Sequence, residues 1–356
     1  MIADLLSPDD VRWRRFLGQA RHDVYHLPAY CRVAGNYERG EPLAFYAEDA
    51  GHAMLMPLLV RDLPSELNAP TGWRDATSPY GYSGPIATVG MPTDVQHALL
   101  GALRELARDR GIVSAFVRQH PFYAMPAAFF EAIGTVVRHG SVVFVDLAKS
   151  EEQWQAETRL DHRRNIGRLI RLGYTVEMDN WTTYPDFKTV YRATMQRHSA
   201  GAFYFFSDDY FDELHRMLHD CVHLCTVRGP DGDVAAGGLF LLVDGIAEYH
   251  LGGTADAHFP KAPSKLMFNF ARGWAKELGA SVLNLGGGIG AAADSLYRFK
   301  SGFSPLEADF YSVRIIFDDE RYARLTEASG ERFDSSDASE GFFPAYRRPP
   351  NANVSA

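Results

Sequence analysis

The sequence predicts an α/β (α+β) fold made of two similar units in tandem, each a mixed sheet flanked by helices. Three observations predict this fold. The 356 residues suggest about two domains, at roughly 100–200 residues per domain. Hydrophobic residues make up 46% of the chain, enough for two cores. One order of elements (hairpin, strand, helix, strand) occurs twice, which favours a duplicated unit over two unrelated domains.

The hairpins open each copy of the repeat. Residues 41–60 (EPLAFYAEDAGHAMLMPLLV) and 222–243 (VHLCTVRGPDGDVAAGGLFLLV) each show two apolar strands around a turn. After a further segment, each hairpin is followed by a glycine-punctuated motif, SPYGYSGP (78–85) or EYHLGGT (248–254). Each motif supplies the strand that precedes the helix of its copy.

A helix and a buried strand complete each copy. Residues 95–111 and 264–279 are amphipathic and end in a glycine, the residue common in a left-handed helix cap. The strands IVSAFVR (112–118) and ASVLNL (280–285) follow at once. The matching order predicts that both units share one topology.

The boundary between the units is predicted near residues 146–151, where an apolar strand passes into a polar helix start. Ser150 stands three residues before a glutamine, as in a capping box. The predicted domains are therefore 1–150 and 151–328. Residues 329–356, rich in Ser, Asp, Pro and Asn, are expected to be a partly disordered tail.

A cationic helix is predicted at residues 153–171, with Ile166, Leu169 and Ile170 on its apolar face. Its other face carries the arginines Arg163, Arg164, Arg168 and Arg171. A solvated surface and a phosphate-binding surface both fit this pattern, since arginine pairs with phosphate in bidentate fashion.

Composition limits the class of protein. The net charge of −9 excludes a generally basic nucleic-acid coat, although a local basic patch is compatible with it. The first residues do not read as a signal peptide, and no stretch approaches the ~18 apolar residues of a membrane span. The three cysteines do not suggest a disulfide framework. We therefore expect a soluble, cytoplasmic protein.

The glycine cluster in VLNLGGGIGAAADSLYRFKSGF (282–303) resembles a dinucleotide loop, because Gly286, Gly288 and Ala291 fit its spacing. A dinucleotide loop should open a long helix, and the sequence here is too short for one. Close backbone approach at a strand end is the preferred explanation. No resident cofactor is predicted.

Metal and hydrolase chemistry have little support. His215 and His219 have i, i+4 spacing, and Cys221, His223 and Cys225 alternate after them. A helix end that leads into a buried strand explains the same residues, so no metal site is expected. The sequence contains no G-x-S-x-G motif of a serine hydrolase.

Several stretches, taken in order, resemble the Fem aminoacyltransferases, which contain two GNAT-like (N-acyltransferase) domains in tandem. They are DHRRNIGRLIRLGYTVEM (161–178), the helix and aromatic segment at 191–214, EYHLGGT, and DSLYRFKSGF, which ends in a Phe-Lys…Gly-Phe motif. The resemblance covers roughly residues 20–320. It implies transfer of an aminoacyl group from aminoacyl-tRNA to an amine of a cell-wall precursor or a small natural product.

The resemblance also implies roles for individual residues. Phe299 would stack on the terminal adenosine of the tRNA, and the Lys300 ammonium would stabilise a tetrahedral oxyanion. The proton acceptor is open among Glu248, His250, Asp294 and groups of the donor itself. The arginine face of 153–171 would hold acceptor-stem or substrate phosphates. Other substrate contacts are expected at Tyr80, Tyr82, Arg118 and Tyr204 on the acceptor side and at Tyr249 and Gly252 on the donor side.

The sequence departs from the family in two places. It has no room for the long helical insertion of some Fem enzymes, and FVRQHPF (116–122) has His120 where an acidic residue is expected. Two alternatives stay open. One is acyl transfer from acyl-CoA or an acyl carrier protein in cell-envelope or polysaccharide metabolism. The other is an inactive binding module for an anionic precursor.

Overall fold

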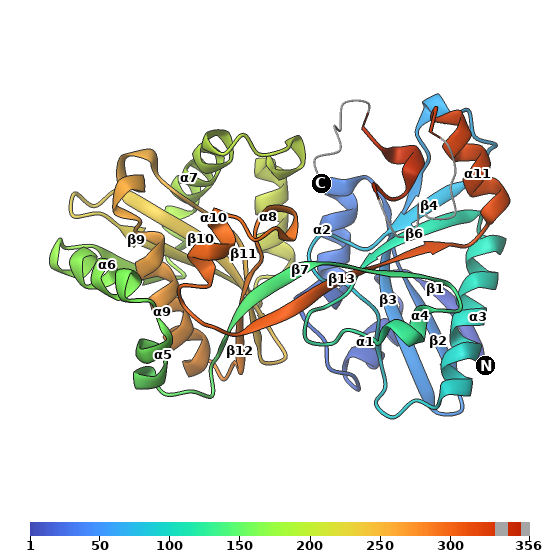
Figure 1. Ribbon diagram of the computed structural model, residues 1–356, viewed down its shortest axis with the longest axis horizontal. Coiled ribbons are helices and arrows are strands. Elements are labelled where there is room, and N and C mark those ends of the chain that lie inside the picture. Colours follow the sequence, from blue (N-terminus) through green and yellow to red (C-terminus); the bar gives the residue numbers. More distant parts are fainter. Residues whose placement is uncertain (332–340, 350–356) are drawn as a thin grey trace. The chain divides into compact units, whose positions relative to one another are not determined.

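The computed structural model describes residues 1–331 and 341–349 and divides into two compact units (Figure 1). Unit 1 comprises Met1–His139 and the described part of Phe310–Ala356, and unit 2 comprises Gly140–Asp309. The ranges 1–150 and 151–328 stay a prediction about the duplicated halves of the sequence. Most of the predicted tail, 332–340 and 350–356, lies outside the described residues.

Unit 1 is a mixed sheet with helices on its faces. Its sheet has the order β1-β2-β3-β4-β6-β13, with β5 paired to β3, and only the β4–β6 neighbours are parallel. The elements are β1 (Ile2–Leu6), α1 (Val11–Leu17), α2 (Pro28–Glu38), β2 (Glu41–Asp49), β3 (His52–Asp62), β4 (Arg74–Thr77), β5 (Ile86–Ala87), α3 (Thr93–Asp109), β6 (Ile112–Arg118), α4 (Ala127–Phe130), β13 (Glu307–Ile316) and α11 (Asp319–Ala328).

Unit 2 repeats this arrangement. Its sheet has the order β7-β12-β11-β10-β9-β8, and only the β11–β12 neighbours are parallel. The elements are β7 (Gly134–Asp146), α5 (Glu151–Glu157), α6 (Leu160–Arg171), β8 (Thr175–Met178), α7 (Tyr184–Arg197), α8 (Asp208–Met217), β9 (Val222–Arg228), β10 (Val234–Val243), β11 (Ile246–Thr254), α9 (Ser264–Glu277), β12 (Val282–Gly286) and α10 (Ser295–Lys300). The predicted α/β fold with mixed sheets and flanking helices is confirmed.

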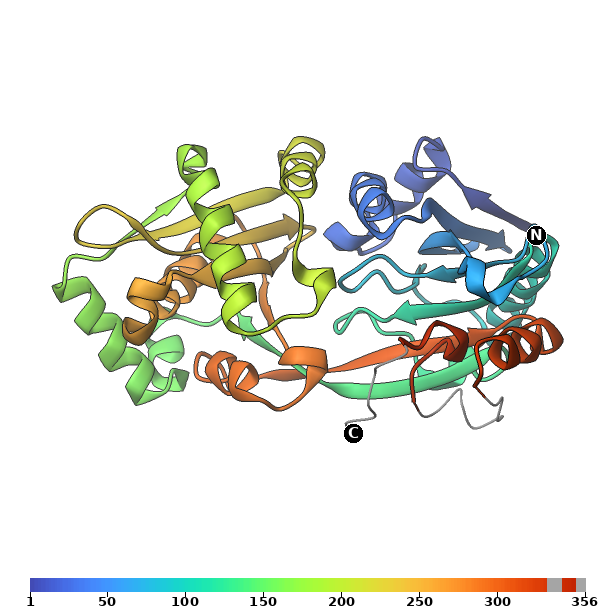
Figure 2. The ribbon, with the colours of Figure 1, turned by 90° about the horizontal axis from the view of Figure 1, so that it is seen from above.

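The last strand of each sheet is exchanged between the halves of the chain. Strand β7 follows β6 in sequence, yet its residues 143–146 pair with β12 of unit 2. Strand β13 follows β12, yet its residues 312–316 pair with β6 of unit 1. Both long strands pass from one unit to the other (Figure 2). This exchange is why residues after 309 return to unit 1.

Local signals in the sequence act as predicted at several points. Both hairpins form, and Gly111 and Gly279, just past α3 and α9, have φ of +71° and +82°. Ser150 caps α5 in a capping box with Gln153. Only glycine adopts such positive φ values without strain, so it ends both helices.

The helix predicted at 153–171 is wrong as a single element. It is two helices, α5 and α6, separated at Thr158, whose backbone is extended with ψ of 127°. The Thr158 hydroxyl bonds the Trp154 carbonyl, and the next amide, from Arg159, donates to Gly302. Ile170, which the sequence places on the apolar face with Ile166 and Leu169, is 59% exposed. Tertiary bonds therefore replace the helical ones at this point.

Two adjacent glycines in β10 show how unit 2 is layered. A Cβ on Gly237 would lie 2.8 Å from Phe187 of α7, and a Cβ on Gly238 would lie 3.1 Å from Met267 of α9. Successive strand residues face opposite sides of a sheet, so α7 and α9 cover opposite faces. No helix in the described part of the chain is long and apolar enough to cross a membrane.

Candidate active site

The parallel strands of unit 2 part at Glu248. The β11–β12 ladder pairs Ile246 with Val282 and ends at Glu248 opposite Asn284. Strand β11 continues to Thr254, and a bulge opposite the step from Leu239 to Phe240 interrupts its pairing with β10. The parallel pairing therefore ends at Glu248, while β11 itself runs on past it.

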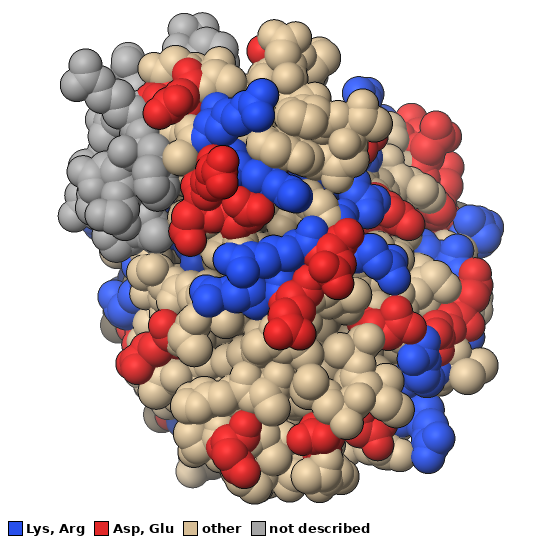
Figure 3. All heavy atoms as spheres, turned by 90° about the vertical axis from the view of Figure 1, so that its right-hand side faces the viewer, with Lys and Arg blue, Asp and Glu red and all other residues tan. Residues whose placement is uncertain are grey.

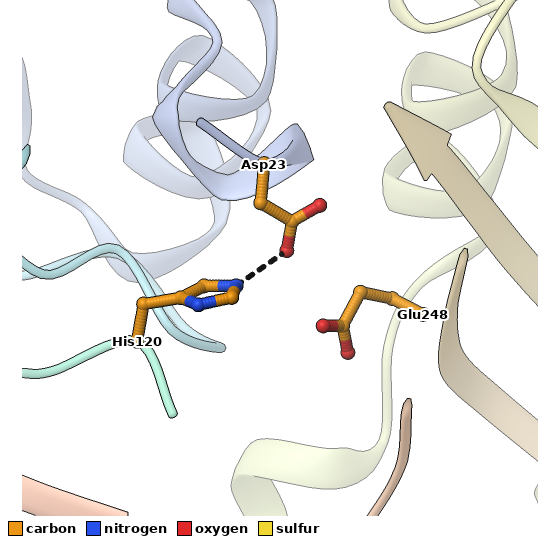
Figure 4. Close-up of side chains that lie close together, drawn as sticks. All are labelled: Asp23, His120 and Glu248. Atoms are coloured by element: carbon orange, nitrogen blue, oxygen red, sulfur yellow. Dashed lines mark hydrogen bonds and ion pairs between the residues drawn. The ribbon is translucent and has the colours of Figure 1, made fainter. Parts of the chain in front are cut away.

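A carboxylate lies in this strand end. Glu248, drawn among the side chains of Figure 4, is 1% exposed, and Asn284 is fully buried. The Asn284 Nδ2 group donates to both Glu248 oxygens, at 3.1 and 2.9 Å, and its Oδ1 accepts from the Gly286 amide at 2.9 Å. Asn284 was not predicted from the sequence. The available signal was an asparagine inside an apolar strand, which needs a buried polar partner.

A buried lysine lies beside the backbone that follows β12. The Lys300 Nζ, at the end of α10, donates to the Gly287 carbonyl at 2.7 Å and lies 5.8 Å from the centre of the Tyr249 ring. Burial disfavours the ammonium and lowers the pKa of Lys300 to about 8, although Asp294 and Glu248 oppose that shift. A lysine with this pKa is readily charged at neutral pH.

Asp294 begins the helix that carries Lys300. Its Oδ1 accepts from the Tyr297 amide at 2.8 Å and its Oδ2 from the Ile289 amide at 2.9 Å. Burial raises the pKa of Asp294, and these backbone hydrogen bonds outweigh burial, so the net shift is downward. A Cβ on Gly288 would lie 2.3 Å from Asp294 Oδ1, which explains one glycine of the cluster. In the structure Asp294 is an N-cap, and its predicted catalytic role stays a prediction.

Phe299 belongs to an aromatic cluster under α10. Its ring packs near His162, Phe268 and Phe303, with centroids 5.5, 5.8 and 5.7 Å away. His162 Nε2 donates to the Phe299 carbonyl at 2.9 Å, and a Cβ on Gly302 would lie 2.4 Å from that nitrogen. The glycine of the Phe-Lys…Gly-Phe motif, Gly302, is therefore needed because any side chain there would collide with the His162 ring. Stacking of Phe299 on adenosine stays a prediction.

Two further predicted residues share one contact. The Tyr249 ring packs against Phe268 with centroids 4.6 Å apart, and a Cβ on Gly252 would lie 2.3 Å from the Tyr249 hydroxyl. Burial raises the pKa of Tyr249. Gly252 therefore makes space for this phenol, and Tyr249 is the closer of the two to Lys300 in the contacts that the structure shows.

His250 and Tyr204 lie toward α7 and α8. His250 is the bulge residue of β11, and its Nε2 lies 3.2 Å from the Tyr210 hydroxyl. Burial lowers the pKa of His250 to about 3, so its ring is neutral and a weak base. The Tyr204 carbonyl accepts from the Tyr191 hydroxyl at 2.9 Å.

The other predicted acceptor residues, Tyr80, Tyr82 and Arg118, belong to unit 1. Arg118 ends β6, and its Nη1 donates to the Ser78 carbonyl at 3.1 Å. The Tyr80 amide donates to Glu38 Oε1 at 2.9 Å. The Tyr82 ring lies 5.5 Å from that of Phe310. All three gather around the ends of β4 and β6.

His120 has a buried carboxylate partner that the sequence did not predict. Its Nε2 donates to Asp23 Oδ2 at 3.1 Å, and its Nδ1 accepts from the Phe122 amide (Figure 4). Both side chains have no exposed surface, and Asp23 Oδ1 accepts from the Val24 amide at 2.6 Å. The two residues are 97 apart in sequence, so spacing could not reveal the pair.

The predicted cationic face is exposed on α6. Its buried side carries His162, Ile166 and Leu169, and Asn165 Nδ2 ties it to the Lys261 carbonyl at 3.1 Å. Within residues 1–331 and 341–349, no ion pair involves the exposed arginines Arg163, Arg164, Arg168 and Arg171. We name these four residues the arginine ridge.

The surface of unit 1 differs in its charges. Figure 3 shows basic and acidic side chains mixed on the face that carries α3 and α11. Arg74 pairs there with Glu41 at 3.0 Å and Arg321 with Asp318 at 3.1 Å. The ridge on α6 is thus a more one-sided source of positive charge.

The histidines and cysteines near residue 220 have other contacts. His215 stacks on Trp181 with centroids 3.6 Å apart, and His223 Nδ1 lies 2.9 Å from Asp179. Cys225 is buried in β9, and burial raises the pKa of its thiol. These contacts account for the residues as parts of the packing of unit 2.

Residues 156–301 match the family model described as an acetyltransferase (GNAT) domain. Unit 2 carries a GNAT acyltransferase domain. The match takes in Glu248, Asn284 and Lys300, so the strand end described above lies inside the GNAT domain. No curated protein matches the chain.

Solved structures extend the likeness to both units. The crystal structure of FemX is similar over 90% of this chain and 99% of its own, with 13% identity and a TM-score of 0.69. L-PGS from Bacillus licheniformis and the C-terminal domain of a putative lysylphosphatidylglycerol synthetase from Agrobacterium fabrum each have 17% identity. Each covers 86% of this chain and 92% of its own, with TM-scores of 0.55 and 0.54. The chain therefore has the FemAB-like fold, with two GNAT-like units in tandem.

Proposed function

We propose that this acyltransferase moves an aminoacyl group from aminoacyl-tRNA to an amine and forms an amide bond. The acceptor is a cell-wall precursor or a small natural product. The observation that carries the proposal is that a GNAT domain holds both a buried carboxylate, Glu248, bonded to Asn284 of β12, and a buried lysine, Lys300, bonded to Gly287 just after β12. The fold shared with FemX and a lysylphosphatidylglycerol synthetase supports an aminoacyl donor.

Glu248 is the best proton acceptor of the three candidates. Both Asp294 oxygens are used by backbone amides, and the low pKa of His250 makes it a poor base. The acceptor ammonium gives one proton to Glu248, and the free amine attacks the ester carbonyl. The new C–N bond forms, the C–O ester bond breaks, and the second nitrogen proton passes to the leaving hydroxyl. Glu248 then releases its proton to solvent.

Lys300 stabilises the tetrahedral oxyanion between these two steps. An ammonium in a buried site interacts more strongly with developing negative charge than one in water. One N–H bond of Lys300 is fixed on Gly287, and this contact holds the side chain in place before the substrate arrives. Asp294 and Gly288 serve by fixing α10, which carries Lys300.

The donor and the acceptor have separate surfaces in this proposal. The arginine ridge would bind tRNA phosphates, and Phe299 and Tyr249 would contact the donor's acyl end. Tyr80, Tyr82, Arg118 and Tyr204 stay predicted contacts of the acceptor. No metal or resident cofactor takes part in the proposed reaction.

A second candidate is acyl transfer from acyl-CoA, which the acetyltransferase description of the matched family favours. Thermal-shift titration separates the donors, because a ligand stabilises only a protein that binds it. Acyl-CoA would raise the melting temperature in the second case and aminoacyl-tRNA in the first. Binding of either without turnover would favour an inactive binding module.

Transfer assays test the proposal directly. Purified protein is mixed with charged tRNAs or acyl-CoAs and with amine acceptors, and amide formation is measured by mass spectrometry. Lys300→Ala should lower the rate by roughly 10²–10³-fold, as loss of an oxyanion donor does. Arg298→Ala, an exposed residue of the same helix, is the matched control and should keep its rate. Full activity of Lys300→Ala would contradict the oxyanion role.

A further inference from the structure

We propose that Asn284 is the positioning residue of the active site, and that its amide holds Glu248 in the orientation that accepts the proton. This inference rests on the proposed function, since it assumes that Glu248 acts as the base. It adds a residue that is neither charged nor part of any motif in the sequence.

The orientation of the Asn284 amide is fixed by its second contact. Its Oδ1 lies 2.9 Å from the Gly286 amide, a donor, so Oδ1 must be the acceptor of that bond. The Nδ2 group therefore faces Glu248, 3.1 Å from Oε1 and 2.9 Å from Oε2. The side chain cannot turn over without losing both contacts. The backbone of the glycine cluster thus determines which group Glu248 meets.

The backbone on both sides is also fixed. Glu248 and Asn284 are direct partners in the last register of the parallel β11–β12 ladder. Asn284 has no exposed surface and Glu248 has 1%. Because the carboxylate is hydrogen-bonded at both oxygens and its backbone is held in a ladder, it is already oriented before a substrate binds.

The neutrality of the amide suits a base. A cation in direct contact with Glu248 would favour its ionised form strongly and so weaken its affinity for a proton. Asn284 supplies hydrogen bonds without a full charge, while the Lys300 ammonium is held on the Gly287 carbonyl. Asn284 therefore orients Glu248 with an amide dipole instead of a full charge.

The first test varies the basicity of the acceptor. Alkyl amines are protonated at neutral pH and need a base, whereas methoxyamine is already neutral and needs none. Asn284→Ala should lose up to about 10²-fold in kcat with an alkyl amine, the scale of a misplaced reacting group, and far less with methoxyamine. Glu248→Gln should show the same pattern. Ser281→Ala removes a hydrogen bond near the start of the same strand, to Gly245, and should change neither rate.

The second test separates orientation from packing. Asn284→Asp places two carboxylates together and should destabilise the protein, measured by chemical denaturation. The double variant Glu248→Gln with Asn284→Asp restores a donor–acceptor pair with reversed polarity. It should recover stability and leave kcat for alkyl amines low, because the carboxylate now lies on β12.

The outcomes decide the proposal. Selective loss with alkyl amines, together with a stable but slow double variant, supports the positioning role. An equal loss of kcat with both amines, or recovery of kcat in the double variant, would overturn the positioning role of Asn284. The proposed function would still stand. No transfer by the wild-type chain from any acyl donor rejects the proposed function and this role with it, whatever the stability measurements give.

Discussion

The parallel strand pairs of the two units share one topology and end differently. Counting five residues from the glycine after each helix, 111 to 116 and 279 to 284, gives Phe116 in unit 1 and Asn284 in unit 2. The Phe116 carbonyl accepts from the Ser78 amide at 2.8 Å, and the Arg118 amide donates to Ser78 Oγ at 3.0 Å. Asn284 instead bonds Glu248.

The difference shows what the duplicated fold provides and what the side chains add. Both units build a parallel strand end beside a helix. In unit 1 the hydrogen bonds of Ser78 join the two strand ends, and Arg118 is the charged residue there. In unit 2 the strand end holds a buried acid and a buried lysine. The fold supplies the place, and the chemistry depends on these few residues.

Among the tests of this comparison, the largest effect is expected from a change that makes the end of unit 2 like that of unit 1. Asn284→Leu, similar in volume and apolar like Phe116, removes the donor to Glu248 and leaves a buried carboxylate short of hydrogen bonds. We expect transfer to alkyl amines to fall by roughly 10²-fold. Phe116→Leu in unit 1 is the matched control, and a fall of the same size there would break the comparison.

The contribution of the C-terminal segment to the stability of unit 1 can also be tested. Asp75 of unit 1 is fully buried between two arginines, with Arg61 Nε and Arg347 Nη2 each 3.0 Å from its Oδ1. Arg347→Ala leaves Arg61 as the remaining partner and should lower the free energy of unfolding of unit 1 by about 2 kcal/mol. Hydrogen exchange resolved by unit measures this loss. Arg348→Ala, in a half-exposed pair with Glu331, should cost under about 1 kcal/mol.

The pH dependence of the transfer rate should reflect the charge of Lys300 in unit 2. The folded pKa of Lys300, about 8, is below its usual 10.5, so its positive charge is lost as the pH rises through 8. The rate should then fall by up to about tenfold per pH unit above that value. Lys300→Arg keeps a charge at these pH values and should remove the alkaline decline, even if its rate is lower. If the rate of Lys300→Arg still declines at alkaline pH as in the wild type, the decline belongs to another titrating group.

The arginine ridge should give the smallest effects. Arg164→Ala and Arg168→Ala should each weaken tRNA binding several-fold and reduce the slope of log affinity against log salt by about 1. Fluorescence anisotropy at several salt concentrations measures both quantities. Arg216→Ala, an exposed arginine on α8, serves as the control. An unchanged slope in the ridge variants would show that the tRNA binds elsewhere.

Local features of the fold were predictable from the sequence. The hairpins, the glycines at the helix ends and the Ser150 capping box depend on neighbouring residues, and each is present. The break at Thr158 was not predictable, because the Gly302 carbonyl that takes the next amide is distant in sequence. The exchange of β7 and β13 also depends on distant pairing, which no periodicity records.

The residues of the candidate site also fall into those that the sequence suggests and those that only the fold brings together. Lys300 and Phe299 were found through a motif, and Glu248 through its place in EYHLGGT. Asn284 lies 36 residues from Glu248, and Asp23 lies 97 from His120, so only the folded chain brings each pair together. Spacing rules find residues on one element, whereas these pairs join two elements. A polar residue inside a buried strand was the one usable sign of Asn284.

The exchanged strands set an order for the growth of the chain on the ribosome. The sheet of unit 1 needs residues 312–316 beside β6, and these are synthesised after the whole of unit 2. Until then the backbone of β6 has an open edge, the kind of surface that pairs with other chains. An N-terminal fragment cut near residue 150 would keep this open edge permanently. The nascent protein is therefore most exposed to aggregation late in translation, when most of its length has already been made.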